Sequence, residues 1–262
     1  MFPPANETVL ITGASSGIGL ELARSFAADG CRLVLLARST DALEALAGEL
    51  RREHGIEAHV VMADLSLPET PAQVFEEVQG RGIVVDILVN NAGFGACGGF
   101  ADLPLQRQLN MIQVNLTALT ALTGLFLPGM IGRGRGGVLN VGSVAGYLPG
   151  PTMAIYFASK AFVLSFTDAL AEELVGTGVT ATVLCPGPTE SNFGIVARGQ
   201  KERRRKTGKM TAKSVAQDGH DAFRRGKSVA ISGWRNRILV LLIWLMPRRA
   251  VRKMAKFFNQ TQ

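Results

Sequence analysis

The chain has 262 residues, of which 47% are apolar, and a formal net charge of +7. This length and apolar content are typical of a globular α/β protein with a substantial core, and they exclude a disordered or fibrous chain. The three cysteines follow no C-x-x-C spacing and form no sequence cluster with the histidines, so we expect neither a disulfide framework nor a metal site. The same cysteine usage and the lack of a signal-like segment in "MFPPANETVL" lead us to expect a cytoplasmic protein.

The positive charge is concentrated in the last quarter of the chain. Residues 198–262 carry 18 Lys and Arg but 3 Asp and Glu, whereas residues 1–197 carry 10 basic and 18 acidic side chains. No aromatic platform accompanies the basic residues, so nucleic-acid binding is not expected.

Continuous apolar runs rich in β-branched residues alternate with helical patterns along most of the chain. Such runs are typical of strands that are buried on both faces of a parallel sheet. The pattern predicts one α/β domain over residues 1–262, a Rossmann-like doubly wound parallel sheet of about seven strands with helices on both faces. The predicted strands begin near Thr8, Arg32, Ala58, Asp86, Gly137, Val179 and Ser228.

A glycine-rich turn, "TGASSGIG", follows the first predicted strand and opens the first helix. Gly13 permits the sharp turn, Gly17 lets the backbone approach a pyrophosphate, and Gly19 allows close packing of helix on strand. The N-terminus of the helix would then face the phosphates with free N–H groups. A glycine-rich turn without a ligand is the alternative.

The spacing G-x-x-x-G-x-G closely resembles the short-chain dehydrogenase/reductase family, and the resemblance extends to "CPGPTES" near residue 190. It implies that "MADLS" flanks the adenine, that "NNAG" lies on the adenosine side, and that the "CPG" loop orients the nicotinamide. The cofactor-binding residues implied are Gly13, Ser15, Ser16, Gly17, Ile18, Gly19, Asp64, Leu65, Asn91, Ala92, Gly93, Pro186, Gly187 and Thr189, together with Tyr156 and Lys160.

The end of the second strand indicates which cofactor is preferred. Sites that favour NAD usually place a carboxylate there, whereas this chain has "LLARS" with Arg38. A guanidinium holds a 2′-phosphate that a carboxylate would repel. We therefore expect NADP(H), with NAD(H) as the weaker candidate.

The segments after the fifth strand contain a candidate catalytic set. Ser143 ends that strand, Tyr156 follows 13 positions later, and Lys160 lies one helical turn beyond. The resemblance implies that Tyr156 is the acid or base, that Ser143 holds the carbonyl oxygen, and that Lys160 lowers the tyrosine pKa and binds ribose. It implies that Asn115 distorts its helix to hold a relay water, although a satisfied core asparagine is equally consistent with the sequence.

Two segments near the C-terminus have less certain roles. Residues 188–213 correspond to the family's lid over the substrate, and the basic run within them could meet an acidic group or be a solvated loop. In the extension 235–262, the apolar run Ile238 to Met246 is too short to span a bilayer, and Pro247 should kink or end its helix. This extension could cover the pocket, form a subunit interface or contact a membrane surface peripherally.

Taken together, these features predict an NADP(H)-dependent oxidoreductase that exchanges a hydride with a carbonyl or secondary alcohol. We expect a hydrophobic acyl-, steroid- or xenobiotic-like substrate, with Phe94, Leu148 and Met153 as an apolar wall. The alternatives are an epimerase or dehydratase on the same scaffold, or a non-catalytic NADP(H) sensor. By resemblance to the family we expect a homodimer or homotetramer.

Overall fold

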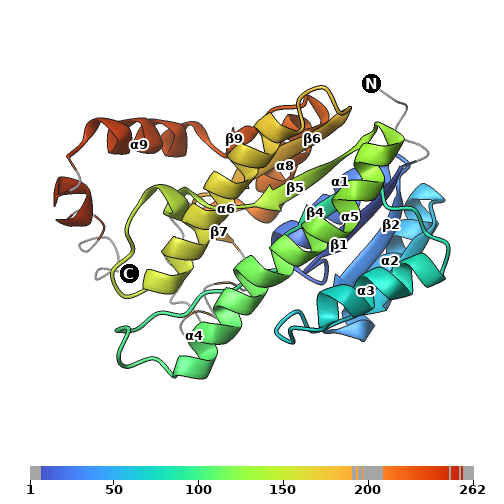
Figure 1. Cartoon of the computed structure of the whole chain (residues 1–262), viewed down its shortest axis with the longest axis horizontal. Coiled ribbons are helices and arrows are strands. Elements are labelled where there is room, and N and C mark those ends of the chain that lie inside the picture. Colours follow the sequence, from blue (N-terminus) through green and yellow to red (C-terminus); the bar gives the residue numbers. More distant parts are fainter. Residues whose placement is uncertain are drawn as a thin grey trace.

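The computed structural model describes residues 7–190, 193, 197, 209–247, 249–253 and 255. Its centre is a seven-stranded parallel sheet with the order β3-β2-β1-β4-β5-β6-β9 (Figure 1). The predicted Rossmann-like sheet is therefore confirmed. The strands of this sheet are β1 (Thr8–Thr12), β2 (Arg32–Ala37), β3 (Ala58–Met62), β4 (Ile87–Asn90), β5 (Gly136–Val141), β6 (Val179–Cys185) and β9 (Val229–Ile231).

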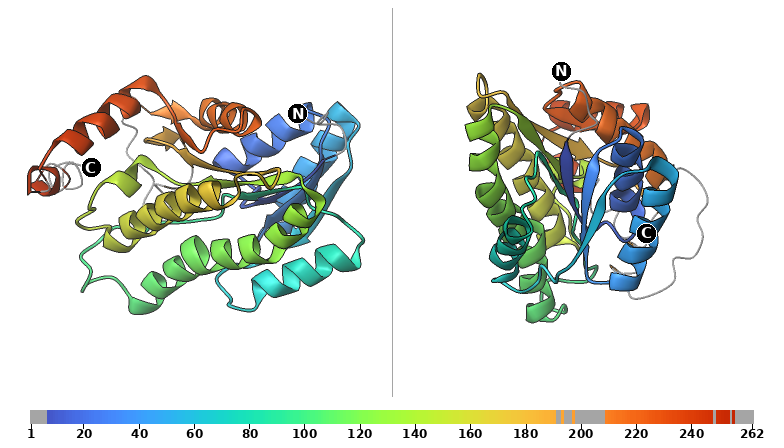
Figure 2. Two further views of the ribbon diagram at one scale, coloured as in Figure 1. Left: turned by 45° about the horizontal axis from the view of Figure 1, so that its top comes forward. Right: turned by 90° about the vertical axis from the view of Figure 1, so that its right-hand side faces the viewer.

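Helices cover both faces of this sheet, as Figure 2 shows. One face carries α1, α2 and α8, and the other carries α3, α5 and α6. The helices are α1 (Gly17–Ala28), α2 (Thr40–His54), α3 (Thr70–Gly80), α4 (Leu105–Ile112), α5 (Leu119–Arg133), α6 (Ala154–Glu173), α8 (Ala212–Arg224) and α9 (Trp234–Leu245), with a π-helical turn η2 (Gln113–Ala118) and a 3₁₀ turn η3 (Val144–Tyr147).

The first strand shows why the strands are apolar throughout. Val9 and Ile11 pack into the core on the α1 side, whereas Leu10 packs into the core on the α5 side. Successive side chains of a strand point to opposite faces, so a strand covered on both faces needs apolar residues at every position.

The strand order places two distant segments side by side. β1 pairs with β4, with Ile11 opposite Val89. The strands β2 and β3 lie on the far side of β1, whereas β5, β6 and β9 lie on the far side of β4. This is the point where the winding of the sheet reverses, and ligands of such sheets bind outside the carboxyl ends of the strands there. The glycine-rich turn after β1 therefore lies beside the "NNAG" segment after β4.

A small second sheet was not predicted from the sequence. β7 (Thr189–Glu190) pairs with β8 (Met210–Thr211) in parallel, and both strands lie near the ends of the segment 188–213 that was expected to form the lid. Most of the predicted lid lies outside the described residues.

Two helical stretches in the described part of the chain, Leu105–Arg133 and Ala154–Glu173, are long and apolar enough to cross a membrane. Length and composition are weak evidence, because core helices of soluble proteins share them. Phe126 and Val163 from these two stretches lie in the core against the sheet. We infer that their apolar residues serve this packing.

Candidate active site

The glycine-rich turn after β1 is shaped by positive φ angles and close approach. Gly13 and Gly17 have φ values of 67° and 59°, which side chains rarely tolerate. A Cβ on Gly19 would collide with the carbonyl oxygen of Gly13 and with the side chain of Asn91. All three glycines are thus required by the geometry of the turn.

Asn91 fastens this turn to the end of β4. Its Nδ2 donates to the carbonyl oxygens of Thr12 at 2.9 Å and Gly13 at 3.1 Å. The backbone N–H groups of Asn91 and Ala92 donate to Thr12 Oγ1 at 2.9 and 3.0 Å. The Asn91 side chain is therefore engaged by the turn itself. Thr12 was not predicted as a site residue; the only signal in the sequence was a hydroxyl directly before the first glycine.

The N-terminus of α1 is suited to an anion. Ser16 is the N-cap residue, and its side chain makes no capping hydrogen bond. The first-turn N–H groups of a helix carry partial positive charge and need an acceptor, which a phosphate provides. The predicted residues Ser15 and Ile18 are half-buried in the same turn. The turn thus fits the pyrophosphate of a dinucleotide.

Arg38 and Asp64 follow the ends of the neighbouring strands β2 and β3. Arg38 is exposed, and the positive charge of its guanidinium stabilises the ionised form of the Asp64 carboxylate. Partial burial would raise the pKa of Asp64, but hydrogen bonds from Ser66 and the charge of Arg38 outweigh it, so this pKa lies below its ordinary value. Leu65 is buried in the core beneath this edge. A charged pair thus stands where the adenosine ribose of a dinucleotide would bind.

Ser143 and Tyr156 meet at the carboxyl end of β5. Ser143 caps η3, with Oγ accepting from Ala145 N at 3.1 Å and donating to Pro186 O at 3.4 Å. Tyr156 lies in the first turn of α6 and is hydrogen-bonded to Ser143. Burial raises the pKa of Tyr156 to about 12, and the hydrogen bond to Ser143 opposes this rise. The phenol is therefore protonated at neutral pH.

Lys160 is buried one turn after Tyr156, and its Nζ donates to Val141 O at 2.7 Å. This nitrogen lies 5.9 Å from the centre of the Tyr156 ring, and burial lowers the pKa of Lys160 to about 8. The expectation that Lys160 moves the tyrosine pKa toward neutrality differs from what is found. Desolvation is the largest influence on both pKa values. It favours the neutral phenol and the neutral amine, so it raises the pKa of Tyr156 and lowers the pKa of Lys160.

Asn115 lies in the π-helical turn between α4 and α5, so the expected local distortion of its helix is present. Its side chain accepts from Phe94 N at 3.1 Å and donates to Phe94 O at 3.0 Å and Ser159 Oγ at 3.1 Å. A Cβ on Gly93 would lie 3.1 Å from Asn115 Oδ1 and 3.7 Å from Lys160 Nζ. Asn115 thus holds the loop after β4 against the helix that carries Tyr156 and Lys160.

The loop after β6 packs against this group. Val144 N donates to Pro186 O at 2.9 Å, and Thr189 Oγ1 donates to Gly187 O at 2.9 Å. A Cβ on Gly187 would collide with Asn236 of α9. Of the predicted residues, Pro186 therefore lies beside Ser143, and Gly187 and Thr189 are hydrogen-bonded to each other just after it.

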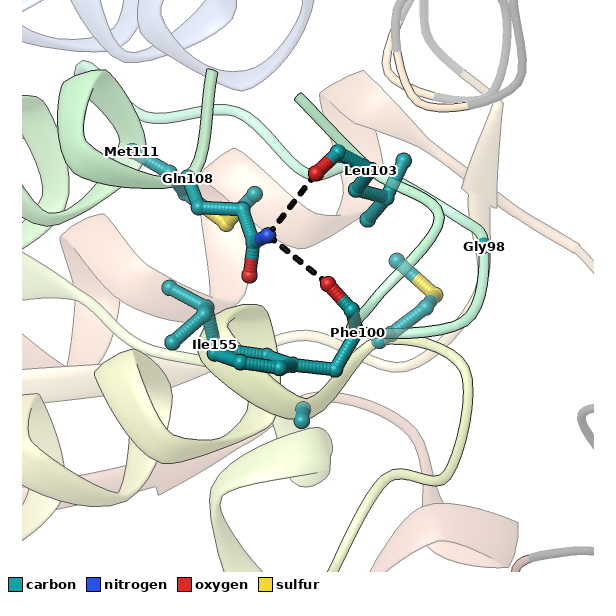
Figure 3. A pocket seen from close by; sticks show the side chains of 9 residues that line it. Gly98, Phe100, Leu103, Gln108, Met111 and Ile155 are labelled. Carbon is teal, nitrogen blue, oxygen red and sulfur yellow. Dashed lines mark hydrogen bonds between the residues drawn. The ribbon is translucent and has the colours of Figure 1, made fainter. Parts of the chain in front are cut away.

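The space next to Tyr156 is apolar. The ring of Phe193 lies 4.9 Å from that of Tyr156, and a Cβ on Gly95 would touch both Phe193 and Met153. Figure 3 shows a small pocket alongside, between the loop after β4, α4 and the start of α6. Met153 lines this pocket, whereas Phe94 and Leu148 of the predicted wall are not among its lining residues.

Gln108 is the polar residue in this pocket, and sequence reasoning missed it. Its Nε2 donates to the carbonyl oxygens of Phe100 at 3.0 Å and Leu103 at 3.1 Å, as Figure 3 shows. Thr152, directly before the lining residue Met153, has φ 68°, and its carbonyl accepts from Gly98 N. Such strain in a non-glycine residue is typical of functional sites.

Comparison with known proteins identifies relatives of this chain. Ketoacyl reductase HetN of Nostoc sp. is 35% identical over 210 residues, which cover 80% of this chain and 72% of the relative. A short-chain dehydrogenase from Sphingobium yanoikuyae, solved in complex with NADPH, is 36% identical with a TM-score of 0.79 and covers 86% of this chain and 87% of its own. A short-chain dehydrogenase/reductase from Burkholderia phymatum, solved in complex with NAD, is 28% identical with a TM-score of 0.80, covering 92% and 94%.

The relatives therefore support a nicotinamide cofactor, but they do not decide between NADP(H) and NAD(H). The family model for short chain dehydrogenases matches residues 7–202, which is well over half of the chain. Together with the parallel sheet and the site at its carboxyl edge, this match shows that the chain belongs to the short-chain dehydrogenase family and is an oxidoreductase acting on alcohol and carbonyl groups.

Proposed function

We propose that this protein reduces the carbonyl group of a hydrophobic substrate with NADPH and that Tyr156 donates the proton. The observation that carries the proposal is the hydrogen-bonded pair of Tyr156 and Ser143 at the end of β5, with buried Lys160 one turn away. When bound, NADPH would be the source of the hydride that the carbonyl carbon accepts. Tyr156 gives its proton to the carbonyl oxygen, and the product is a secondary alcohol.

The protonated state of Tyr156 suits the step in which a carbonyl oxygen receives a proton. Because burial raises the pKa of Tyr156 to about 12, the phenol carries its proton at neutral pH and can act as a general acid. In this proposal Ser143 Oγ, whose hydrogen makes a long bond of 3.4 Å to Pro186 O, gives that hydrogen to the same carbonyl oxygen as negative charge develops there. Oxidation of an alcohol would instead need the phenolate.

Lys160 and Asn115 act as positioning residues in this proposal. Lys160 Nζ keeps two of its three hydrogens beyond the one given to Val141 O, and these can reach ribose hydroxyls. Asn115 fixes the loop at Phe94 and so the wall that faces the nicotinamide.

The cofactor preference rests on Arg38. An exposed guanidinium at the end of β2 suits the 2′-phosphate of NADP(H), with which it can form charge-assisted hydrogen bonds. Asp64 on the next strand end already neutralises part of that charge, so the preference is for NADP(H) without exclusion of NAD(H).

The substrate class follows from the apolar surroundings of Tyr156. Phe193, Met153 and the pocket beside them offer apolar contacts and few polar partners. Ketones of acyl chains or steroid-like rings bury such surface well, and a smaller xenobiotic carbonyl is the second candidate. The relative named a ketoacyl reductase supports the acyl class.

Replacement of Tyr156 by Phe tests the proposal, and the chain offers a matched control because Tyr147 is its other tyrosine. We expect Tyr156→Phe to lower kcat by about 100-fold or more while NADPH binding is retained. Tyr147→Phe, which removes a half-buried hydroxyl bonded to Cys185, should leave kcat within a few-fold, roughly. An unchanged rate in Tyr156→Phe, measured on a ketone panel by nicotinamide absorbance, would contradict the mechanism.

We also infer that the chain pairs through helices α5 and α6 into a homodimer or homotetramer. Phe162 is exposed on α6 and stacks on Phe166 with ring centres 5.7 Å apart, and Ile131 is exposed on α5. If this surface is the interface, a Phe162→Glu variant should have a lower molar mass than the wild-type protein when measured by light scattering.

A further inference from the structure

Helix α9 is apolar on two opposite sides. Val240 and Ile243 on its inner side are 7% exposed and pack on the protein. Trp244 is 77% exposed, and five large residues on the outer side are between 47% and 76% exposed. These residues recur at the three- and four-residue spacing that puts them in one stripe. They are Trp234, Ile238, Leu241, Leu242 and Leu245.

Basic side chains flank this outer stripe. Arg235 and Arg237 project next to it on α9, and the Arg235 guanidinium lies 5.4 Å from the centre of the Trp234 ring. Exposed Arg249, Arg252 and Lys253 follow after Pro247. Within the part of the chain that the structure describes, no ion pair joins these five cations to a carboxylate. The sequence itself contains no Asp or Glu after Asp221.

α9 lies at the edge of the molecule, beyond β9 and next to the site (Figure 1). Its Asn236 donates to Ser232 O at 2.7 Å and contacts Gly187 of the loop after β6. The helix is thus anchored through its inner face and presents its outer face away from the core.

We propose that α9 and the basic residues after Pro247 bind in the plane of an anionic lipid surface, with the outer stripe of α9 in the acyl-chain boundary. An in-plane amphipathic helix needs a continuous apolar stripe, basic residues at its borders and aromatic residues at the interface, and α9 has all three. Its twelve residues span about 18 Å, too short to cross a hydrocarbon core of about 30 Å.

The charge distinguishes a lipid surface from a second copy of the chain. Two copies meeting through this stripe would bring their uncompensated cations together, and like charges at an interface oppose association. An anionic headgroup layer attracts each of these cations instead. This proposal does not depend on the reaction that the enzyme catalyses.

Tryptophan fluorescence offers a selective measurement, because the only two tryptophans of the chain, Trp234 and Trp244, both lie on α9. With the full chain, we expect vesicles of phosphatidylcholine and phosphatidylglycerol to shift the emission to shorter wavelength and to co-sediment the protein. Vesicles of phosphatidylcholine alone should bind at least about tenfold more weakly, and added salt should weaken binding to the anionic vesicles.

Two double variants and their controls complete the test. Leu241→Glu with Leu245→Glu should reduce partitioning at least about tenfold, since it places carboxylates in the stripe. Arg249→Gln with Arg252→Gln should reduce it about tenfold through charge. The controls are Val175→Glu, at an equally exposed apolar residue away from α9, and Arg52→Gln with Arg225→Gln, which removes the same charge elsewhere.

The proposal is overturned if anionic vesicles produce neither sedimentation nor a spectral shift. It is also overturned if the controls lose binding as much as the α9 variants do. A blue-shifted spectrum without vesicles, together with a dimer mass that Leu241→Glu with Leu245→Glu abolishes, would assign the stripe to a second copy instead.

Discussion

The carboxyl edge of the sheet and the outer face of α9 differ in how their side chains are partnered. At the edge, Asn91 and Asn115 are buried or half-buried, and each makes several hydrogen bonds to the loops around it. On α9, large apolar side chains stand exposed, and no ion pair joins Arg235 or Arg237 to a carboxylate within the described residues. Hydrogen bonds within the chain fix the side chains at the edge of the sheet in the absence of a ligand. The side chains on the outer face of α9 can be buried only by contact with another molecule. Substitutions should therefore be costly at the first region and nearly silent for folding at the second.

The largest effect is expected at the glycine turn. Gly19→Ala places a methyl group against Gly13 O and the Asn91 side chain, so the turn must open. We expect NADPH affinity to fall by about 100-fold or more, because the phosphate cradle depends on that close approach. Fluorescence titration with NADPH measures this.

Gly48→Ala in the middle of α2 is the matched control for this variant. Its new methyl group would meet only the flexible end of Arg52 at 3.4 Å. The unfolding free energy should stay equal or rise by up to about 1 kcal/mol, since alanine favours a helix. Equal NADPH affinity in both glycine variants would show that the turn does not form the cradle.

Arg38→Ala should have the next largest effect. Loss of the guanidinium removes charge-assisted hydrogen bonds to a 2′-phosphate, so NADPH affinity should fall about tenfold or more while NADH affinity stays constant. Isothermal titration with both cofactors checks this. A parallel loss for both would place Arg38 outside the 2′ position.

Lys160 should make stability depend on pH. Its folded pKa of about 8 lies below its ordinary value of 10.5, so the folded protein releases this proton before the unfolded chain does. The contribution of Lys160 to the unfolding free energy should therefore rise between about pH 8 and pH 10.5, by up to roughly 3 kcal/mol. Below pH 8 the buried charge is a constant cost.

Comparison with Lys160→Met removes the background from Cys31, whose pKa burial raises to about 11 and which titrates in both proteins with the opposite sign. Cys185, whose pKa burial raises to about 12, interacts with the Lys160 charge, so the difference reports Lys160 together with this interaction. Urea unfolding at several pH values should show that the unfolding free energy of the wild-type protein rises relative to that of Lys160→Met between about pH 8 and pH 10.5. Parallel profiles would mean that Lys160 is not desolvated.

The smallest effects are expected on α9. Leu245→Ser on the outer stripe should change the unfolding free energy by no more than about 0.5 kcal/mol, because the side chain is already exposed. Ile243→Ala on the inner side should cost about 2 kcal/mol, since it leaves a cavity. Similar losses at both positions would show that the outer stripe is covered in the free protein.

Much of the site could be predicted because its motifs are local. The turn from Thr12 to Gly19 contains backbone conformations that few residues other than glycine adopt, so the glycine spacing in the sequence predicts it directly. Tyr156 and Lys160 lie one helical turn apart, which fixes their shared face. The end of α9 before Pro247 was likewise predictable, because proline cannot continue a helix.

Other features depend on contacts between distant segments. The bond from Asn91 to the glycine turn joins positions 78 and 79 residues apart, and Asn115 reaches Phe94 across 21 residues. Gln108 became part of a pocket wall, and the Thr152 carbonyl came to accept from Gly98 N, only when the loop after β4 met the start of α6. The pKa of Tyr156 was misjudged because sequence shows which charge is near but not how much water is removed.

The sequence by itself determined the strand-and-helix alternation, the glycine-rich turn and the placement of Tyr156 and Lys160 on one helical face, because these follow from backbone preferences and spacing within one or two elements. Only the tertiary structure decided which polar groups are already satisfied, how desolvation shifts the tyrosine and the lysine, and which face of α9 remains exposed. Burial is a property of the whole packed chain, and each of these features is a consequence of burial.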